Sequence, residues 1–229
     1  MMRHPTIPFG TSLWLYGILS TFFIIGAILW LTKFCNTMQK KYIRIAIAIV
    51  YSISFFAFHI YTYYNGLWDR HNSLPLHLCS ISMVCGIISM FTLNVITFEW
   101  SCYFGIAGGL NAIISPEFIN GFDRFYLVQF YVDHGGVLLM PLFLGIYEGL
   151  KPRTMSWMKI FYSLNLLSIF LFVFNWLNES NYMYVNAKPA SESPLLIGHW
   201  PWYILGLEIV ALAHFYIIYV LFHGLKQWK

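Results

Sequence analysis

Long apolar runs separated by short polar connections dominate the chain. A helix needs about 20 apolar residues to cross the hydrocarbon core of a bilayer, and seven runs approach or exceed this length. We therefore predict an all-α fold, a polytopic membrane protein that forms a bundle of seven transmembrane helices. The predicted spans are Ser12–Leu31, Ile45–Tyr64, Leu76–Val95, Ser101–Ser115, Phe125–Tyr147, Ile160–Leu177 and Trp200–Phe222.

The connections between these runs are short, and the sequence shows no internal repeat or low-complexity tract. We therefore expect a single integral membrane domain over residues 1–229. The fourth run is the shortest and carries Gly105, Gly108 and Gly109. Because glycine weakens a helix, we expect this run to be kinked or re-entrant.

The composition agrees with this class. The chain is 59% hydrophobic and only 10% charged, whereas a soluble domain carries about 25% charged residues. We expect a multi-pass protein of the cell membrane, in a bacterium the inner or plasma membrane, with membrane lipid as its partner. The basic residues flank the apolar runs and form no stripe, so no nucleic-acid partner is expected. The oligomeric state stays open.

The basic residues also predict an orientation, because cytoplasmic loops carry an excess of Lys and Arg. Four of the 13 basic residues would lie on one side of the bundle: Arg3, Arg70, Arg124 and Lys188. Nine would lie on the other: Lys33, Lys40, Lys41, Arg44, Lys151, Arg153, Lys159, Lys226 and Lys229. The richer side is predicted to be cytoplasmic, which gives an N-terminus outside and a C-terminus inside.

Most of the ionisable groups within the spans then fall in the outer half of the bundle. Ionisable residues in a bilayer usually face a bundle interior or a wet cavity. We therefore expect a polar cavity open to the outer side, although hydrogen bonds that only hold helices together are an alternative. The residues concerned are His59, Cys79, Asp133, His134 and Glu208.

Two of these residues are candidates for acyl chemistry. Ser73 can cap the third span and Pro75 suits its first turn, which puts Cys79 in the second turn, where a thiolate gains some stabilisation. His134 stands before Gly135 and Gly136, where a helix or a ligand could come close. Cys79 could equally be a packing cysteine, and His134 a hydrogen-bonded core histidine.

The other candidates are weaker. His77 is two residues from Cys79, and such neighbours do not face each other on a helix. His59, Asp133 and Glu208 are each compatible with a structural hydrogen bond as well as with binding or orienting a substrate. The four cysteines have no metal-ligand spacing, and we expect neither a metal nor a cofactor.

The connection between the last two spans is unusually rich in polar and aromatic side chains. Its tryptophans, Trp200 and Trp202, fit an interfacial aromatic belt, but such a belt does not explain the presence of Asn181, Tyr182 and Lys188. We expect this loop to fold over the outer mouth of the bundle, with Lys188 pairing with a lipid phosphate at the rim. A loop lying flat on the membrane is the alternative.

Several segments together resemble a known family. These are Leu74-Pro75-Leu76-His77-Leu78-Cys79-Ser80-Ile81, His134, Asn181-Tyr182-Met183-Tyr184 with Lys188-Pro189, and Trp200-Pro201-Trp202-Tyr203. They resemble the YwaF-like integral membrane family of bacteria, which is distantly similar to eukaryotic transmembrane phospholipid acyltransferases. The resemblance implies a cysteine nucleophile and a histidine base within the membrane, and Cys79 and His134 are the matching positions.

The sequence therefore favours a membrane-embedded acyltransferase or acyl hydrolase that acts on a lipid. Cys79 would hold the acyl group as a thioester, and His134 would act as the base, with Asp133 or Glu208 orienting its ring. The alternative is a non-enzymatic transporter or a substrate-binding membrane protein, in which the same cavity holds a small solute.

Overall fold

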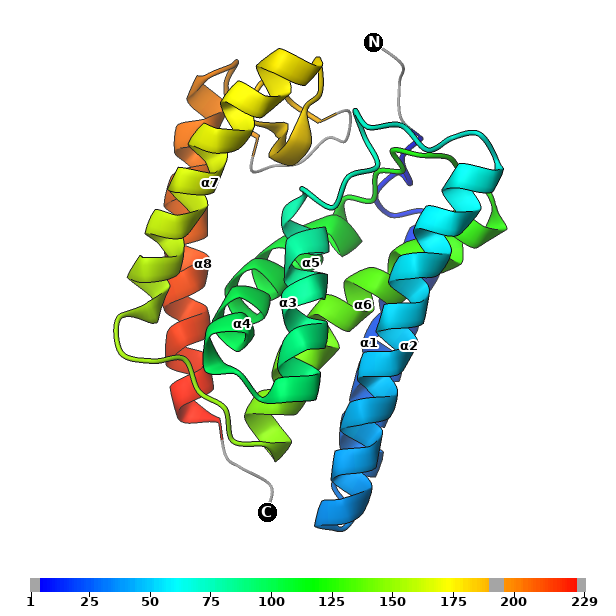
Figure 1. Ribbon diagram of the computed structural model, residues 1–229, viewed down its shortest axis with the longest axis vertical. Coiled ribbons are helices and arrows are strands. Elements are labelled where there is room, and N and C mark those ends of the chain that lie inside the picture. The colour runs from blue at the N-terminus through cyan, green and yellow to red at the C-terminus, as the bar shows by residue number, and fades with distance from the viewer. Residues whose placement is uncertain (1–4, 190–195, 226–229) are drawn as a thin grey trace.

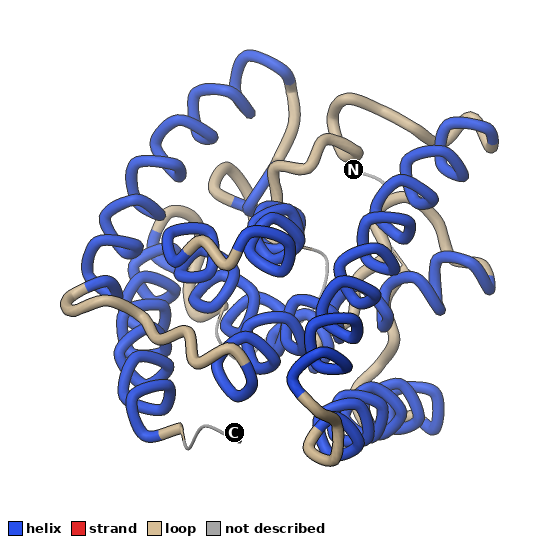
Figure 2. The backbone as a smooth tube through the Cα atoms, turned by 60° about the horizontal axis from the view of Figure 1, so that its bottom comes forward, coloured by secondary structure: helices blue, strands red, loops and turns tan. Residues whose placement is uncertain are grey.

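Helices side by side make up the computed structural model, which describes residues 5–189 and 196–225 (Figure 1). Figure 2 shows short loops joining them and no strand in the described part of the chain. The helices are α1 (Ser12–Thr32), α2 (Thr37–Tyr64), α3 (Leu78–Thr92), α4 (Val95–Trp100), the π-helix η1 (Ser101–Gly105), α5 (Ile106–Ile114), α6 (Arg124–Tyr147), α7 (Ser156–Asn178), the short 3-10 helix η2 (Tyr182–Tyr184) and α8 (Trp202–Gly224).

Five of these helices are long and apolar enough to cross a membrane: α1, α2, α6, α7 and α8. The other two predicted spans are shorter or interrupted. Helix α3 has 15 residues, about 22 Å at the usual rise, and begins at Leu78 where the sequence predicted Leu76. The fourth predicted span begins earlier than expected, because α4, η1 and α5 run without a break from Val95 to Ile114, about 30 Å.

The two ends of the bundle differ in charge. We call the end with the described N-terminus the N-face and the end with the described C-terminus the C-face (Figure 1). The N-face carries Arg70, Arg124 and Lys188. The C-face carries Lys33, Lys40, Lys41, Arg44, Lys151, Arg153 and Lys159. The predicted grouping of basic residues therefore holds for these positions, while Arg3, Lys226 and Lys229 lie outside the described residues.

The kink expected in the fourth span is a π-helical segment. Ser101–Gly105 is π-helical and fully or almost fully buried, and such turns interrupt the regular hydrogen-bond ladder of an α-helix. A methyl group added at Gly105 would lie 2.6 Å from the carbonyl oxygen of Val137 in α6. Glycine is required here because the two backbones nearly touch.

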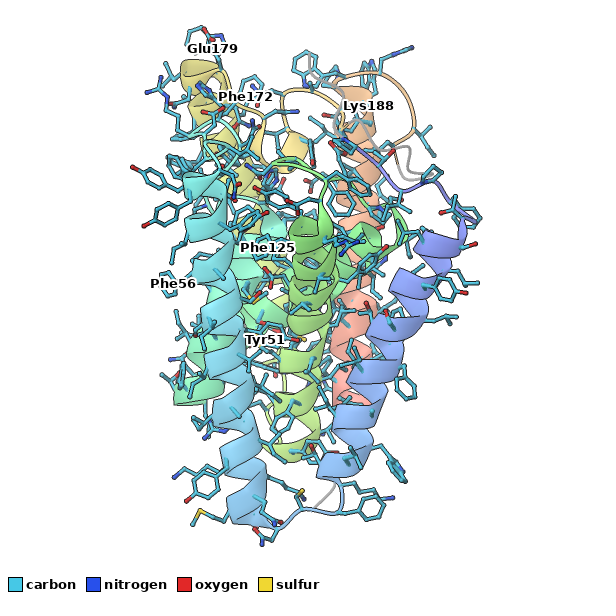
Figure 3. All side chains as sticks on the ribbon, turned by 90° about the vertical axis from the view of Figure 1, so that its right-hand side faces the viewer. Tyr51, Phe56, Phe125, Phe172, Glu179 and Lys188 are labelled. Atoms are coloured by element: carbon cyan, nitrogen blue, oxygen red, sulfur yellow. The ribbon has the colours of Figure 1, made fainter. Side chains whose placement is uncertain are left out.

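Helix α6 is the central element of the bundle. It contacts α1, α2, α3, η1 and α5, and its C-terminal half is almost entirely buried. In Figure 3, Tyr51 points from α2 toward the interior while Phe56 points away from it. A methyl group at Gly136 would overlap the Tyr51 ring, so the close approach expected at this glycine is made by a neighbouring helix.

Ion pairs close the C-face. The guanidinium of Arg153 donates two hydrogen bonds to Glu99, at 2.9 and 2.7 Å, and the backbone N–H of Arg153 donates a third at 2.7 Å. The Glu99 side chain is only 1% exposed. On the other side of the bundle, Arg44 pairs with Glu148 at 2.8 Å and donates to the carbonyl of Met90. These contacts tie α2, α3, α4 and α6 together with the loop before α7.

Replacement of Arg153 by alanine should destabilise the protein. It leaves the Glu99 carboxylate buried without its cation, and breaking a buried pair in this way costs about 3 kcal/mol. Thermal unfolding in detergent micelles checks this, with Lys151→Ala as the control. Lys151 lies in the same loop and donates only an exposed hydrogen bond to the carbonyl of His223. Equal unfolding temperatures for the two variants would contradict the role of the pair.

Candidate active site

A cavity of about 460 Å³ lies below the loops of the N-face. Its walls come from α2, α3, α5, α6, α7 and α8, and its upper end is formed by loop residues 72–75, 115–121 and 183–189. Most of the lining side chains are apolar, although the sequence predicted a polar cavity. A volume of this size with a few polar groups is typical of a small-molecule or lipid site.

The cavity brings together six of the eleven residues proposed from the sequence. Those that line it are His59, His77, Cys79, Asp133, His134 and Glu208. The five candidates of the last connection do not line it: Asn181, Tyr182, Lys188, Trp200 and Trp202. The membrane-embedded candidates are therefore grouped, and the loop candidates are separate from them.

The start of α3 differs from the expectation. His77 is the N-cap and Pro75 precedes the helix, so Ser73 does not cap it. Ser73 instead accepts hydrogen bonds from the backbone N–H of Asp69 and the side chain of Asn120, at 3.1 and 2.8 Å. As a result Cys79 lies in the first turn, where the positive end of the helix dipole is strongest.

Consecutive glycines of α5 make room for both proposed catalytic residues. A methyl group on Gly108 would lie 3.4 Å from the sulfur of Cys79, and one on Gly109 would lie 3.4 Å from the carbonyl oxygen of His134. Helices α3 and α6 therefore approach α5 at neighbouring positions. This packing explains how two residues 55 positions apart in the sequence come to line one cavity.

The tautomer of His134 is fixed by a hydrogen bond. Its Nδ1 lies 2.7 Å from the carbonyl oxygen of Phe130. A carbonyl can only accept, so Nδ1 carries the proton and Nε2 of the neutral ring has a lone pair. The ring is thus oriented by its own helix backbone, and Nε2 is the nitrogen that can act as a base.

The two cavity carboxylates proposed from the sequence, Asp133 and Glu208, are held by other groups. Asp133 accepts hydrogen bonds from Ser54 of α2, at 2.5 Å, and from Gln129. Glu208 accepts one from Asn165 of α7, at 2.9 Å. The carbonyl of Phe130 accepts the hydrogen bond from Nδ1 of His134. The His134 ring is therefore oriented by this backbone carbonyl and not, as the sequence predicted, by Asp133 or Glu208.

Two further histidines contact the loops. His59 accepts a hydrogen bond from the indole of Trp68 at 3.3 Å. His77 accepts one from the backbone N–H of Met183 at 3.3 Å, and its ring lies beside those of Tyr182 and Tyr184. His77 therefore joins the start of α3 to the last connection.

Tyr182 anchors the last connection to the rest of the N-face. Its fully buried side chain donates to the carbonyl of Arg70 at 2.6 Å and accepts from the N–H of Leu74 at 3.0 Å. Burial raises the pKa of Tyr182 to about 12, so the hydroxyl stays a donor. Below it, the buried Asn175 amide bonds both the N–H and the carbonyl of Tyr182 at 2.9 Å.

These bonds place the loop over the cavity, as the sequence predicted. Met183, Tyr184, Val185 and Pro189 all line the cavity, while residues 190–195 of the same loop lie outside the described part. The labelled side chain of Lys188 is at the same end of the bundle as Glu179 (Figure 3).

The other loop candidates have contacts within the loop itself. Lys188 donates to the carbonyl of Leu196 at 2.8 Å and lies 5.5 Å from the ring of Tyr203, so this geometry does not support pairing with a lipid phosphate. Asn181 bonds the backbone of residues 186 and 187. Trp200 donates to the carbonyl of Val185 at 3.1 Å, and Trp202 is 67% exposed, as in an aromatic belt.

Several polar residues of the cavity were not proposed from the sequence as site residues, among them Glu117, Tyr184 and His214. Glu117 lies in a loop that only the fold brings to the mouth. His214 donates from Nδ1 to the carbonyl of Val210, at 2.7 Å, in the same way as His134. The aromatic and polar richness of the last connection was the available signal for Tyr184. Among the described residues, no group of three His, Cys, Asp or Glu side chains could hold a metal ion.

These observations define a multi-pass helical membrane protein with a mainly apolar cavity beneath one face. Residues 8–219 match the sequence model of the TMEM164 family. The match covers most of the chain, and the protein belongs to this family. No curated protein matches the chain, and no solved structure matches it.

Loss of the Tyr182 hydroxyl should loosen the loop over the cavity. Tyr182→Phe leaves the N–H of Leu74 and the carbonyl of Arg70 without this partner, and an unsatisfied buried group costs about 1–3 kcal/mol. Limited proteolysis of the connection between α7 and α8, in micelles, should become about 10-fold faster. Tyr63→Phe, at an exposed tyrosine of α2, is the control. Unchanged cleavage in Tyr182→Phe would show that the loop does not depend on this anchor.

Proposed function

We propose that this protein is a membrane-embedded acyltransferase or acyl hydrolase that acts on a lipid ester. Cys79 is the nucleophile and His134 is the base. The observation that carries the proposal is the cavity itself, which is lined by a thiol in the first turn of α3 and by a histidine whose Nε2 can accept a proton.

The reaction has two halves. Nε2 of His134 takes the thiol proton while the sulfur of Cys79 attacks the ester carbonyl, and the leaving alcohol then receives that proton as a thioester forms. In the second half, His134 deprotonates the acceptor, an alcohol or water. The acceptor oxygen attacks the thioester, and the sulfur of Cys79 leaves and recovers the proton. Splitting acyl transfer in this way replaces one difficult step by two easier ones.

The lining of the cavity supports a lipid substrate. Apolar side chains from α3, α5, α7 and α8 contribute much of the lining, and an acyl chain packed against them would lose its contact with water. The polar groups beside Cys79 and at the loops would then face the ester and the glycerol end. Ion pairs close the C-face, whereas at the N-face only loops cover the cavity.

We further propose that the N-face is outside the cell and that all seven helical rods cross the membrane. The excess of Lys and Arg on the C-face supports a cytoplasmic C-face. Helix α3 and the rod from α4 to α5 pack against several neighbouring helices, so a length below that of an isolated span is compatible with crossing as part of the bundle.

Removal of the thiol should abolish acyl transfer. Cys79→Ala should lower the turnover of a phospholipid ester by at least about 10³-fold, because the covalent intermediate is lost, and His134→Gln should act similarly. Cys85→Ala, which changes a cysteine of α3 that does not line the cavity, should stay near wild type. The measurement is release and transfer of a labelled acyl chain in micelles.

Direct detection of the intermediate separates this function from simple lipid binding. Wild-type protein should carry a hydroxylamine-sensitive acyl group on Cys79 after incubation with labelled phospholipid. Lipid that binds equally well to wild type and Cys79→Ala, with no acyl group on Cys79, would point to a binding protein instead.

Thiol labelling tests the orientation. The native Cys35 lies in the C-face loop and Glu179 at the N-face. A membrane-impermeant maleimide applied to intact cells should label Glu179→Cys in a Cys35→Ser background but should not reach Cys35 in the wild type. Permeabilised cells should give labelling at both positions. The reverse pattern in intact cells would invert the proposed topology.

A further inference from the structure

We propose that Tyr184 is a further catalytic residue of this site, whose hydroxyl donates a hydrogen bond to the carbonyl oxygen of the ester that Cys79 attacks. The proposal rests on the acyl-transfer function above. Tyr184 belongs to the last connection and lines the cavity. Neither a role as a structural anchor nor the Cys79–His134 pair explains its presence there.

The backbone at Tyr184 is unusual. Met183 and Tyr184 are consecutive non-glycine residues with φ of 56° and 55°, in the left-handed region that such residues rarely adopt. Each such conformation is unfavourable and persists only where the surroundings enforce it, often at functional sites. An ordinary connector would avoid two in succession.

Three hydrogen bonds hold this strained pair in place. The N–H of Met183 donates to His77, and the N–H of Tyr184 donates to the carbonyl of Asn181 at 3.1 Å. The hydroxyl of Tyr203 donates to the carbonyl of Tyr184. With Tyr182 fixed by its own hydroxyl, the segment is rigid on both sides. Its conformation turns the Tyr184 side chain into the cavity.

The Tyr184 hydroxyl is available for a ligand. The centroid of the Tyr184 ring lies 5.4 Å from that of His77, which stands at the N-cap position of α3, the helix that carries Cys79. Within residues 5–189 and 196–225, the hydroxyl makes no hydrogen bond, in contrast to the hydroxyls of Tyr182 and Tyr203. An unpartnered hydroxyl in a mainly apolar cavity is costly without an acceptor, and an ester carbonyl would supply one.

The hydroxyl also stays protonated in this environment. Burial raises the pKa of Tyr184, and electrostatic interactions with Glu117 and Cys79 raise it further. Since these effects disfavour the phenolate, Tyr184 is a hydrogen-bond donor throughout the physiological pH range.

Backbone amides at the start of α3 complete the arrangement. His77 provides no side-chain cap, and the N–H groups of Leu78 and Ser80 have no acceptor in the described part of the chain, while the N–H of Cys79 points at its own sulfur. All three residues line the cavity. Tyr184 from above and these amides from the helix start would thus meet around a carbonyl carbon placed beside the Cys79 sulfur.

The role is electrostatic and moves no proton through Tyr184. When the sulfur attacks, the carbonyl π electrons pass to oxygen and a tetrahedral oxyanion forms. The Tyr184 hydroxyl and the α3 amides donate hydrogen bonds to this oxyanion, which stabilises it in a water-poor site. The oxyanion then collapses, the C–S bond stays and the C–O bond to the leaving alcohol breaks, with the proton supplied by His134.

The test is the rate of acylation of Cys79 by a labelled phospholipid, measured in a single turnover. Tyr184→Phe keeps the ring and should slow this step by about 10²–10³-fold, as loss of one oxyanion donor does, with lipid affinity and thermal stability nearly unchanged. Tyr63→Phe is the matched control. Tyr184 replaced by 3-fluorotyrosine, a more acidic phenol of almost the same size, should restore the rate to wild-type level or above.

A role in loop structure alone would not follow the acidity of the phenol. Acylation by Tyr184→Phe within about threefold of wild type would overturn the proposal, and so would a fluorotyrosine protein as slow as the phenylalanine variant. If wild-type Cys79 is never acylated, the proposed function itself fails. If Cys79 is acylated in the wild type and Tyr184→Phe is acylated at the same rate, only the role of Tyr184 is rejected.

Discussion

The close packing of the fourth helical rod against α6 is the contact on which the rest of the structure depends. At Gly105 the rod lies so near the backbone of α6 that no side chain fits between them, and the π-helical turn at the same place lets the rod change direction there. One turn further on, Gly108 faces the Cys79 sulfur and Gly109 faces α6. The same small-residue surface that joins the helices therefore also leaves space for the Cys79 sulfur and brings the backbone of α6 at His134 close to α5.

The bundle is closed differently at its two ends. At the C-face, buried ion pairs fix α2, α4 and α6 relative to one another, and charged contacts of this kind tolerate little movement because separation would leave a buried charge unpaired. At the N-face, loops cover the cavity, held by hydrogen bonds from Asn175, Tyr182 and Tyr203. The cavity is thus bounded by loops at the N-face, whereas ion pairs close the opposite end.

The grouping of polar residues under the loops gives each a separable role. The carbonyl of Phe130 sets the tautomer of His134, and Ser54 and Gln129 hold Asp133. Lys188 and the two tryptophans are the most conspicuous residues of the last connection, but they do not line the cavity. The connection contributes through Met183 and Tyr184, whose strained backbone is stable only because the surrounding hydrogen bonds fix it.

The sequence by itself determined the helical membrane class, the grouping of basic residues at one end, and the concentration of ionisable residues toward the other. These follow from local properties, since apolar run length, flanking charge and helical rise need no knowledge of neighbours. The residues that line the cavity were also partly predictable, because a polar group inside a span must face the interior. Only the tertiary structure decided that the fourth rod contains a π-helical turn and that Cys79 lies in a first turn. The same is true of the partners of His134 and the position of Tyr184. Each depends on which backbones come close in space, and hydrogen bonds between distant segments leave no periodic signal in the sequence.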